Sequence, residues 1–123
     1  MAMKFSQTGA TVLVPDACAM PEALRRVTHL GIGAHQDDLE FMAFHGIASC
    51  FHADDQWFGG VTCTNGAGSS RAGAYAGFSD EEMQAVRREE QNLAARVGRY
   101  GYMAQLDHPS SNVKSPESNA LRD

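Results

Sequence analysis

The sequence predicts an α/β fold built on a Rossmann-like βαβαβ unit with a parallel sheet. Three short apolar runs have the composition of buried strands, and two longer amphipathic stretches between them have helical periodicity. Strands that alternate with helices in this way are typical of parallel sheets with crossover connections. The chain has 123 residues, of which 43% are hydrophobic, and this is enough for one domain of the kind.

The first elements follow from local composition. A leading segment, residues 1–26, contains a candidate short strand at 10–14. The core region, residues 27–109, begins with an apolar strand at 27–33. Apolar residues at helical spacing then predict a helix at 39–52.

The remaining elements complete the predicted unit. They are a strand at 57–64, a glycine-rich loop at 65–79, a helix at 80–98, a strand at 101–106 and a polar tail at 110–123. The start of the long helix is well marked, because Ser79 is a suitable N-cap and Glu82 completes a capping box. We expect the tail to be poorly ordered.

The long helix combines an apolar stripe with two charged residues. Arg87 and Glu90 fall within the stripe, and their spacing of three lets them pair. A half-buried ion pair explains both residues structurally, whereas a position that faces a pocket gives Arg87 a functional role. The apolar members of the predicted stripe are Met83, Val86, Leu93, Ala94 and Val97.

Strand order decides what covers the sheet. If the three parallel strands lie in consecutive order, right-handed crossovers place both helices on the same face. Parallel sheets are normally covered on both faces. We therefore expect one apolar sheet face to be exposed, and we expect self-association through that face.

A histidine and two carboxylates follow the first predicted strand. His35, Asp37 and Asp38 stand at a strand-to-helix junction, where open α/β sheets bind their ligands. A helix cap is the local alternative, because Asp37 suits an N-cap and Glu40 stands three residues later. A cap accounts for neither His35 nor Asp38, whereas a metal site with a neighbouring base accounts for all three.

At these residues the chain resembles a known family. Residues 33–40, Gly-Ala-His-Gln-Asp-Asp-Leu-Glu, are similar to the Ala-His-Pro-Asp-Asp-x-Glu signature of the LmbE/PIG-L family of zinc-dependent N-deacetylases. Residues 64–68, Thr-Asn-Gly-Ala-Gly, and residues 87–95, Arg-x-x-Glu-x-x-x-Ala-Ala, resemble two later segments of the family in the same order. Gln36 stands where the family usually has proline, and we expect it to loosen the loop without removing a ligand.

The resemblance implies a role for each matched residue. His35 and Asp38 would bind zinc, and Asp37 would be the general base that activates the zinc-bound water. Catalytic zinc usually has three protein ligands and an open position, where it lowers the pKa of water to about 7. Arg87 and Asn65 would contact the substrate, which is expected to be an N-acetylated amino sugar or its conjugate.

The resemblance also implies that part of the metal site is missing from these residues. The third zinc ligand of the family is a histidine in a later His-x-x-His-type segment, and no such segment occurs here. We therefore expect the chain to correspond to the first half of the LmbE-like fold. His108, after the last predicted strand, is a candidate additional ligand. A set of histidine and carboxylate ligands does not distinguish zinc from other divalent metals.

The glycine-rich loop has two interpretations. Its small residues could form a substrate-side wall at the carboxyl edge of the sheet, or residues 69–77 could be a flexible connection. Arg71 could meet an anionic group of the substrate, but a solvated side chain is favoured. A dinucleotide site is not predicted, because Gly31 and Gly33 are not followed by a third glycine at position 36.

Composition limits the partners. A formal net charge of -5 and a pI of about 5.4 argue against a general affinity for nucleic acid, and no apolar run approaches the ~20 residues of a membrane span. The N-terminus lacks the pattern of a secretory signal. The three cysteines form no Cys-x-x-Cys pair, and Cys50 and Cys63 suit small core positions. A reduced, cytoplasmic setting is therefore predicted.

Two functions are open on the sequence alone. The first is a zinc-dependent hydrolase that removes an N-acetyl group from an amino sugar or its conjugate. The second is a non-catalytic metal-binding or interaction fragment of such an enzyme. The ordered motifs favour the first, and the absence of a third ligand favours the second.

Overall fold

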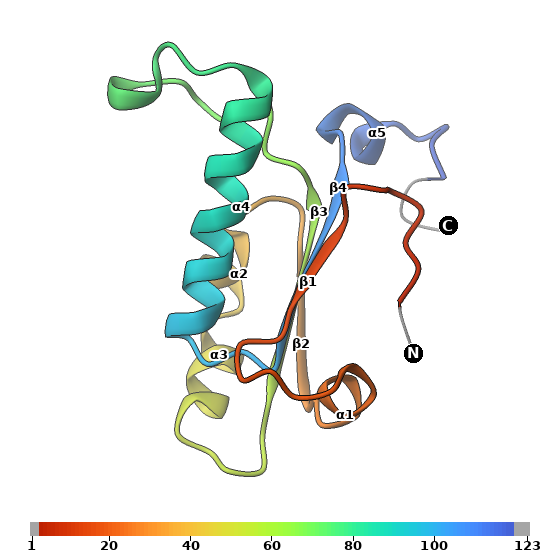
Figure 1. Cartoon of the computed structure of the whole chain (residues 1–123), viewed down its shortest axis with the longest axis vertical. Helices are drawn as coiled ribbons and strands as arrows, with labels where there is room; N and C mark the ends of the chain where they lie inside the picture. Colours follow the sequence, from red (N-terminus) through yellow and green to blue (C-terminus); the bar gives the residue numbers. More distant parts are fainter. Residues whose placement is uncertain (1–2, 120–123) are drawn as a thin grey trace.

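A four-stranded sheet forms the centre of the computed structural model, which describes residues 3–119. The sheet order is β1-β4-β3-β2 (Figure 1). Strands β2 (His29–Gly33), β3 (Phe58–Thr64) and β4 (Tyr102–His108) are parallel, and β1 (Thr11–Leu13) is antiparallel to β4. The three parallel strands are confirmed and lie in consecutive order, and the candidate strand at 10–14 is the edge strand β1.

The main helices cover one face of the sheet, as the crossover rule predicts. Helices α2 (Asp38–Met42), α3 (Phe44–Phe51) and α4 (Asp80–Val97) lie together on this face (Figure 1). Two short helices, α1 (Met20–Arg25) and α5 (Ser110–Lys114), lie on the other side, and a 3-10 turn, η1, spans Gly73–Tyr75. No helix within residues 3–119 combines the length and the apolar character that crossing a bilayer requires.

Two predicted elements need correction. The helix at 39–52 is divided at Ala43 into α2 and α3, and Ala43 packs against the core beside Gly31 of β2. The tail at 110–123, which was expected to be poorly ordered, begins with helix α5. Residues 120–123 lie outside the described part of the chain.

The inward face of α4 is more polar than the sequence predicted. Leu93 and Val97 are 62% and 69% exposed, so the predicted apolar stripe is wrong at both positions. Met83, Gln91 and Ala95 are the buried residues of this helix. The helix is rotated in this way because Gln91 hydrogen-bonds to the segment at the start of α2.

Two glycines let α2 lie directly on β2. A Cβ atom at Gly31 would lie 2.8 Å from the Phe58 ring and 3.1 Å from the Leu39 side chain. A Cβ atom at Gly33 would lie 3.0 Å from Cβ of Asp38. The glycines therefore serve close packing, and this packing sets the position of the loop between β2 and α2.

The two cysteines assigned to the core are buried and free. Cys50 belongs to the main hydrophobic cluster with Leu39, Phe58 and Tyr100. Burial raises the pKa of the Cys50 and Cys63 thiols, so both remain protonated and unreactive near neutral pH. Their prediction as small core residues is confirmed.

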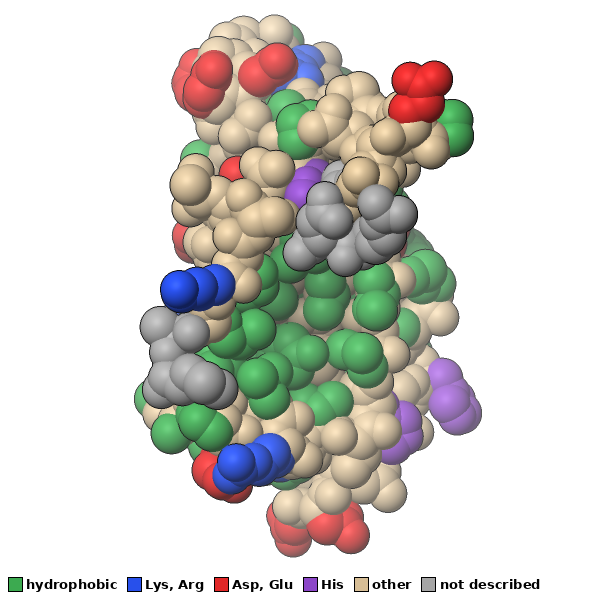
Figure 2. Space-filling model, turned by 90° about the vertical axis from the view of Figure 1, so that its right-hand side faces the viewer, with side chains coloured by type: hydrophobic (Ala, Val, Ile, Leu, Met, Phe, Trp, Pro, Cys, Tyr) green, Lys and Arg blue, Asp and Glu red, His purple; other side chains and the backbone are tan. Residues whose placement is uncertain are grey.

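The opposite face of the sheet is apolar and largely open. Figure 2 shows hydrophobic side chains gathered over the middle of this face. Leu30 and Ile32 of β2 are 56% and 57% exposed, and both alternate with the glycines that face α2. The expected exposed apolar face is confirmed, whereas self-association through it stays a prediction.

The predicted cap of α4 gives a test of local stability. Glu82 N–H donates to Ser79 Oγ at 3.1 Å, and Ser79 N–H donates to the Glu82 carboxylate at 3.2 Å. Ser79→Ala removes the Oγ atom that accepts from Glu82 N–H. This variant should therefore lower the free energy of unfolding by about 1 kcal/mol in urea titrations. The control Ser70→Ala, in an exposed loop, should change it by less than about 0.5 kcal/mol. Equal losses in the two variants would contradict the capping role.

Candidate active site

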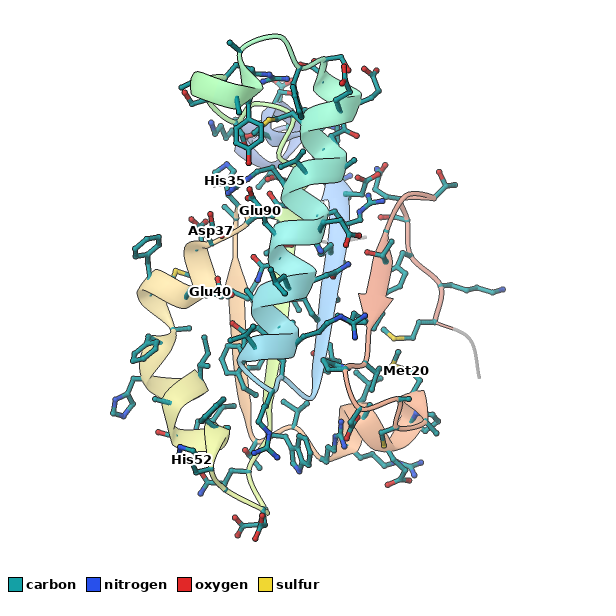
Figure 3. The ribbon with its side chains drawn as sticks, turned by 60° about the vertical axis from the view of Figure 1, so that its left-hand side comes forward. Met20, His35, Asp37, Glu40, His52 and Glu90 are labelled. Carbon is teal, nitrogen blue, oxygen red and sulfur yellow. The ribbon has the colours of Figure 1, made fainter. Side chains whose placement is uncertain are left out.

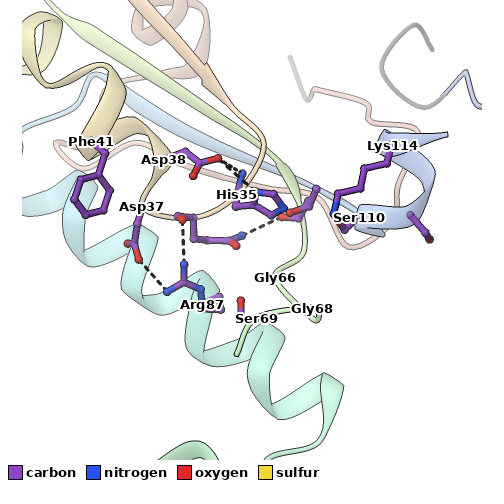
Figure 4. A pocket seen from close by; sticks show the side chains of 13 residues that line it. His35, Asp37, Asp38, Phe41, Gly66, Gly68, Ser69, Arg87, Ser110 and Lys114 are labelled. Carbon is purple, nitrogen blue, oxygen red and sulfur yellow. Dashed lines mark hydrogen bonds and ion pairs between the residues drawn. The ribbon is translucent and has the colours of Figure 1, made fainter. Parts of the chain in front are cut away.

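A pocket of about 660 Å³ lies at the carboxyl edge of the parallel strands. The loops that follow β2 and β3 line it together with α4 and α5 (Figure 4). Its position is the one expected for a ligand site in an open α/β sheet, and its volume suits a small molecule. The predicted site residues that line it are His35, Asp37, Asp38 and Arg87.

His35 and Asp38 are brought together at the edge of the pocket. The distance from His35 Nδ1 to Asp38 Oδ2 is 3.5 Å, and the same carboxylate oxygen accepts a hydrogen bond from His35 N–H at 2.8 Å. Both side chains are partly exposed, at 46% and 37%. Two atoms that bind one tetrahedral ion at about 2.0–2.2 Å lie about 3.4 Å apart. The donor pair therefore has a spacing that fits a shared metal ion.

A third ligand is not among the described residues. Within residues 3–119, no group of three or more His, Cys, Asp and Glu side chains is placed to hold a metal ion. His108 is buried, with 4% exposed, and it is not part of the pocket wall formed by His35 and Asp38. The structure therefore does not bring His108 to the other two predicted ligands.

Asp37 has an unusual backbone conformation and no capping role. Its φ is 72° and its ψ is -17°, and its side chain makes no cap hydrogen bond to α2. The carboxylate instead accepts a hydrogen bond from Arg87 Nη1 at 3.0 Å. Glu40 also makes no capping bond, because it accepts from Gln91 and Tyr100. The capping-box alternative for Asp37 and Glu40 is wrong.

Arg87 connects α4 to the loop that carries the acidic residues. Its guanidinium donates to Asp37 Oδ2 at 3.0 Å and to the Gln36 carbonyl at 3.0 Å (Figure 4). It also donates to Glu90 Oε2. Burial disfavours its charge, but the hydrogen bonds and charges of Asp37 and Glu90 outweigh this effect and raise the pKa of Arg87. The predicted pairing with Glu90 and the predicted position at the pocket both occur.

Gln36 stabilises the loop between β2 and α2. The expectation that glutamine would loosen it is wrong, because the side chain is buried and its Nε2 donates to the Thr64 carbonyl at 3.0 Å. The same amide lies 3.3 Å from Gln105 Oε1. The side chain therefore joins the loop to the end of β3 and the middle of β4, which a proline could not do.

Asn65 shapes the loop after β3. Its Oδ1 accepts from Ala67 N–H at 3.0 Å, and its own N–H donates to the His108 carbonyl at 2.9 Å. Asn65 lies outside the wall of the 660 Å³ pocket. In this arrangement it stabilises the turn, as asparagine does in many loops, and its side chain does not face the pocket.

Arg71 ties the beginning of the glycine-rich loop. Its guanidinium donates to the carbonyls of Ala67 and Ser69 and pairs with Asp80 at the start of α4. The interpretation of Arg71 as a solvated side chain is therefore wrong. Gly68 and Ser69 of this loop line the pocket, as the substrate-wall interpretation expects.

Sequence reasoning missed several contributors to the site. Ser110, Ser111 and Lys114 of α5 line the pocket, although their segment was predicted to be a poorly ordered tail. Gln91, which is buried, was also missed. The available signal was its place four residues after Arg87 on the inward side of α4, where polar residues are uncommon.

The chain was compared with protein-family models, curated proteins and solved structures, and none of them matches it. The likeness to LmbE/PIG-L deacetylases therefore rests on the motifs at residues 33–40, 64–68 and 87–95. The structure places parts of all three motifs around one pocket, through Asp38, Gly66 and Arg87.

Gly66 allows the loop after β3 to pack on Arg87. Its φ is 78°, and an added Cβ would lie 2.8 Å from Gln36 Oε1 and 2.9 Å from Cβ and Cγ of Arg87. Gly66→Ala should therefore lower the free energy of unfolding by about 2 kcal/mol in chemical denaturation. Gly68→Ala is a matched control, because a Cβ there meets nothing within 4 Å. Similar stability of the two variants would contradict this packing.

Proposed function

We propose that the chain belongs to a metal-dependent hydrolase that removes an N-acetyl group from an amino sugar or its conjugate, with zinc as the preferred ion. The observation that carries the proposal is the 3.5 Å spacing of His35 Nδ1 and Asp38 Oδ2 at a pocket that Asp37 also lines. The motif resemblance supports the reaction class. The pocket volume of about 660 Å³ supports a small-molecule substrate.

His35 and Asp38 would hold the metal ion. When bound, zinc would polarise the carbonyl of the N-acetyl group and lower the pKa of a water molecule. The spacing of the two donors fits zinc, although the same donor types also serve iron and manganese. The remaining ligands would be water, substrate or residues outside the described part of the chain, 3–119.

Asp37 would act as the general base. Its Oδ2 is held by Arg87, and no hydrogen bond from residues 3–119 reaches Oδ1. Oδ1 would take one proton from water while the water oxygen bonds to the carbonyl carbon. When the C–N bond breaks, Asp37 would return that proton to the leaving nitrogen. The products are a free amine and acetic acid, which ionises in solvent.

Arg87 would hold the Asp37 carboxylate at the pocket. Arg87→Ala should reduce turnover by about 100-fold, because a small misplacement of a reacting group has an effect of this size. Arg88→Ala is a matched control on the same helix, since Arg88 pairs with Asp107 away from the pocket. Acetate release and thermal unfolding would be measured for both variants. Equal losses of turnover and stability in the two variants would favour a purely structural role for Arg87.

Two substitutions separate the base from the ligand. Asp37→Asn should reduce acetate release by at least about 100-fold while zinc affinity, measured by calorimetry, stays near the wild-type value. Asp38→Asn should weaken zinc binding itself, because an amide oxygen is a poorer ligand than a carboxylate. Asp55→Asn, at an exposed position, is the control for both assays. Loss of zinc in Asp37→Asn, or unchanged zinc affinity in Asp38→Asn, would reverse these assignments.

The alternative function is a metal-binding fragment without catalysis. It is favoured by one observation, namely that residues 3–119 contain no group of three or more side chains suited to a metal. In that case the chain would bind zinc weakly through His35 and Asp38 and release no acetate from N-acetyl sugars. Tight binding of about one zinc per chain with acetate release would exclude this alternative.

A further inference from the structure

A buried polar network lies directly behind Asp37. Gln91 is fully buried in α4, and its Oε1 accepts from Asp37 N–H at 3.0 Å. Its Nε2 donates to Glu40 Oε1 at 2.9 Å, and the Tyr100 hydroxyl donates to the same oxygen at 2.7 Å. Figure 3 shows Glu40 between α2 and α4, below Asp37. The network therefore connects the core of the sheet to the backbone of the predicted base.

Folding alone does not favour this network. Glu40 Oε2 is buried, and it has no hydrogen-bond partner in the described part of the chain. Burial, together with the Glu40 carboxylate, raises the pKa of Tyr100. A buried polar atom without a partner costs free energy that an apolar side chain at the same place would not cost. The retention of this polar cluster, with Glu40 Oε2 unpaired among the described residues, indicates a gain in conformational specificity.

The group that gains this specificity is Asp37. A positive φ is uncommon for residues other than glycine and costs about 1–2 kcal/mol in the left-handed region. Asp37 adopts a φ of 72°, and the hydrogen bond from its N–H to Gln91 opposes relaxation of the backbone. Arg87 holds the carboxylate of the same residue. The backbone and the side chain of Asp37 are thus fixed by two residues of α4, four positions apart.

We infer that Glu40, Gln91 and Tyr100 are positioning residues, which hold the strained backbone of Asp37 so that its carboxylate faces the pocket. This inference rests on the proposed role of Asp37 as a base. The constraint on the Asp37 backbone can nevertheless be measured without turnover, through the exchange of its amide proton.

The first test compares two glutamine substitutions on α4 in the full 123-residue chain. Gln91→Leu should speed hydrogen exchange of the Asp37 amide by about tenfold, because one buried hydrogen bond is lost. It should also lower kcat for acetate release by about 100-fold with KM within about twofold. Gln84→Leu is the matched control, since Gln84 takes no part in these hydrogen bonds. If the two variants show the same Asp37 exchange rate, the inference is overturned.

A second test exchanges the donor and the acceptor. Gln91→Glu alone places two carboxylates against each other and should speed Asp37 exchange. In the double variant Glu40→Gln/Gln91→Glu, the amide at position 40 can donate to the carboxylate at position 91 and accept from Tyr100. The double variant should return the Asp37 exchange rate to within about threefold of wild type. A double variant no better than Gln91→Glu overturns the network.

Tyr100→Phe tests the same network with a smaller change in packing. If Gln91→Leu does not fold, Tyr100→Phe removes one hydrogen bond to Glu40 while it keeps the ring packed edge-on against Phe58. Tyr100→Phe should speed Asp37 exchange by a few-fold, and unchanged exchange would overturn the inference. If wild type releases no acetate, the proposed function fails, but the exchange rates still decide whether the network holds Asp37.

Discussion

The guanidinium of Arg87 joins α4 to the loop between β2 and α2, and the candidate site depends on this junction. It contacts the Asp37 carboxylate, the Gln36 carbonyl and Glu90 at once, while its side chain is largely buried. Asp37 and Glu90 both pair with Nη1 of Arg87, so without this positive charge two carboxylates would lie close together with no cation between them. With it, Asp37 turns toward α4 and Asp38 turns toward His35 (Figure 4). The two neighbouring acids thus have different partners, Arg87 for Asp37 and His35 for Asp38.

Buried polar side chains surround this junction in place of apolar ones. Gln36 and Gln91 are buried where leucine would suit a simple helix–sheet interface. Glycines at the crossing of α2 and β2 bring the loop close to the sheet, so that short side chains can reach backbone groups on β3. The hydrogen bonds of Gln36, Arg87 and Gln91 therefore gather at the pocket end of the helical face.

The sequence predicted what depends on local periodicity and on general rules of topology. The three parallel strands and the Ser79 cap follow from such rules, and the helices lie on one face because the strands are in consecutive order. The pairing of His35 and Asp38 could also be predicted from the sequence, because residues three apart meet at the start of a helix. The contact of Asp37 with Gln91 could not be predicted, because 54 residues separate the two in sequence. No local pattern encodes the rotation of α4 that brings them together. That rotation also exposes Leu93 and Val97, against the amphipathic pattern.

The central claim is that the loop after β2 holds His35 and Asp38 so that they share a divalent metal ion. Asp37 pairs with Arg87 and does not bind the ion. Anomalous diffraction at the zinc edge from crystals equilibrated with zinc tests this most directly. The account predicts one strong peak within about 2.0–2.2 Å of His35 Nδ1 and an Asp38 oxygen, with the Asp37–Arg87 ion pair intact. A peak bound to Asp37, or no peak at saturating zinc, would contradict it.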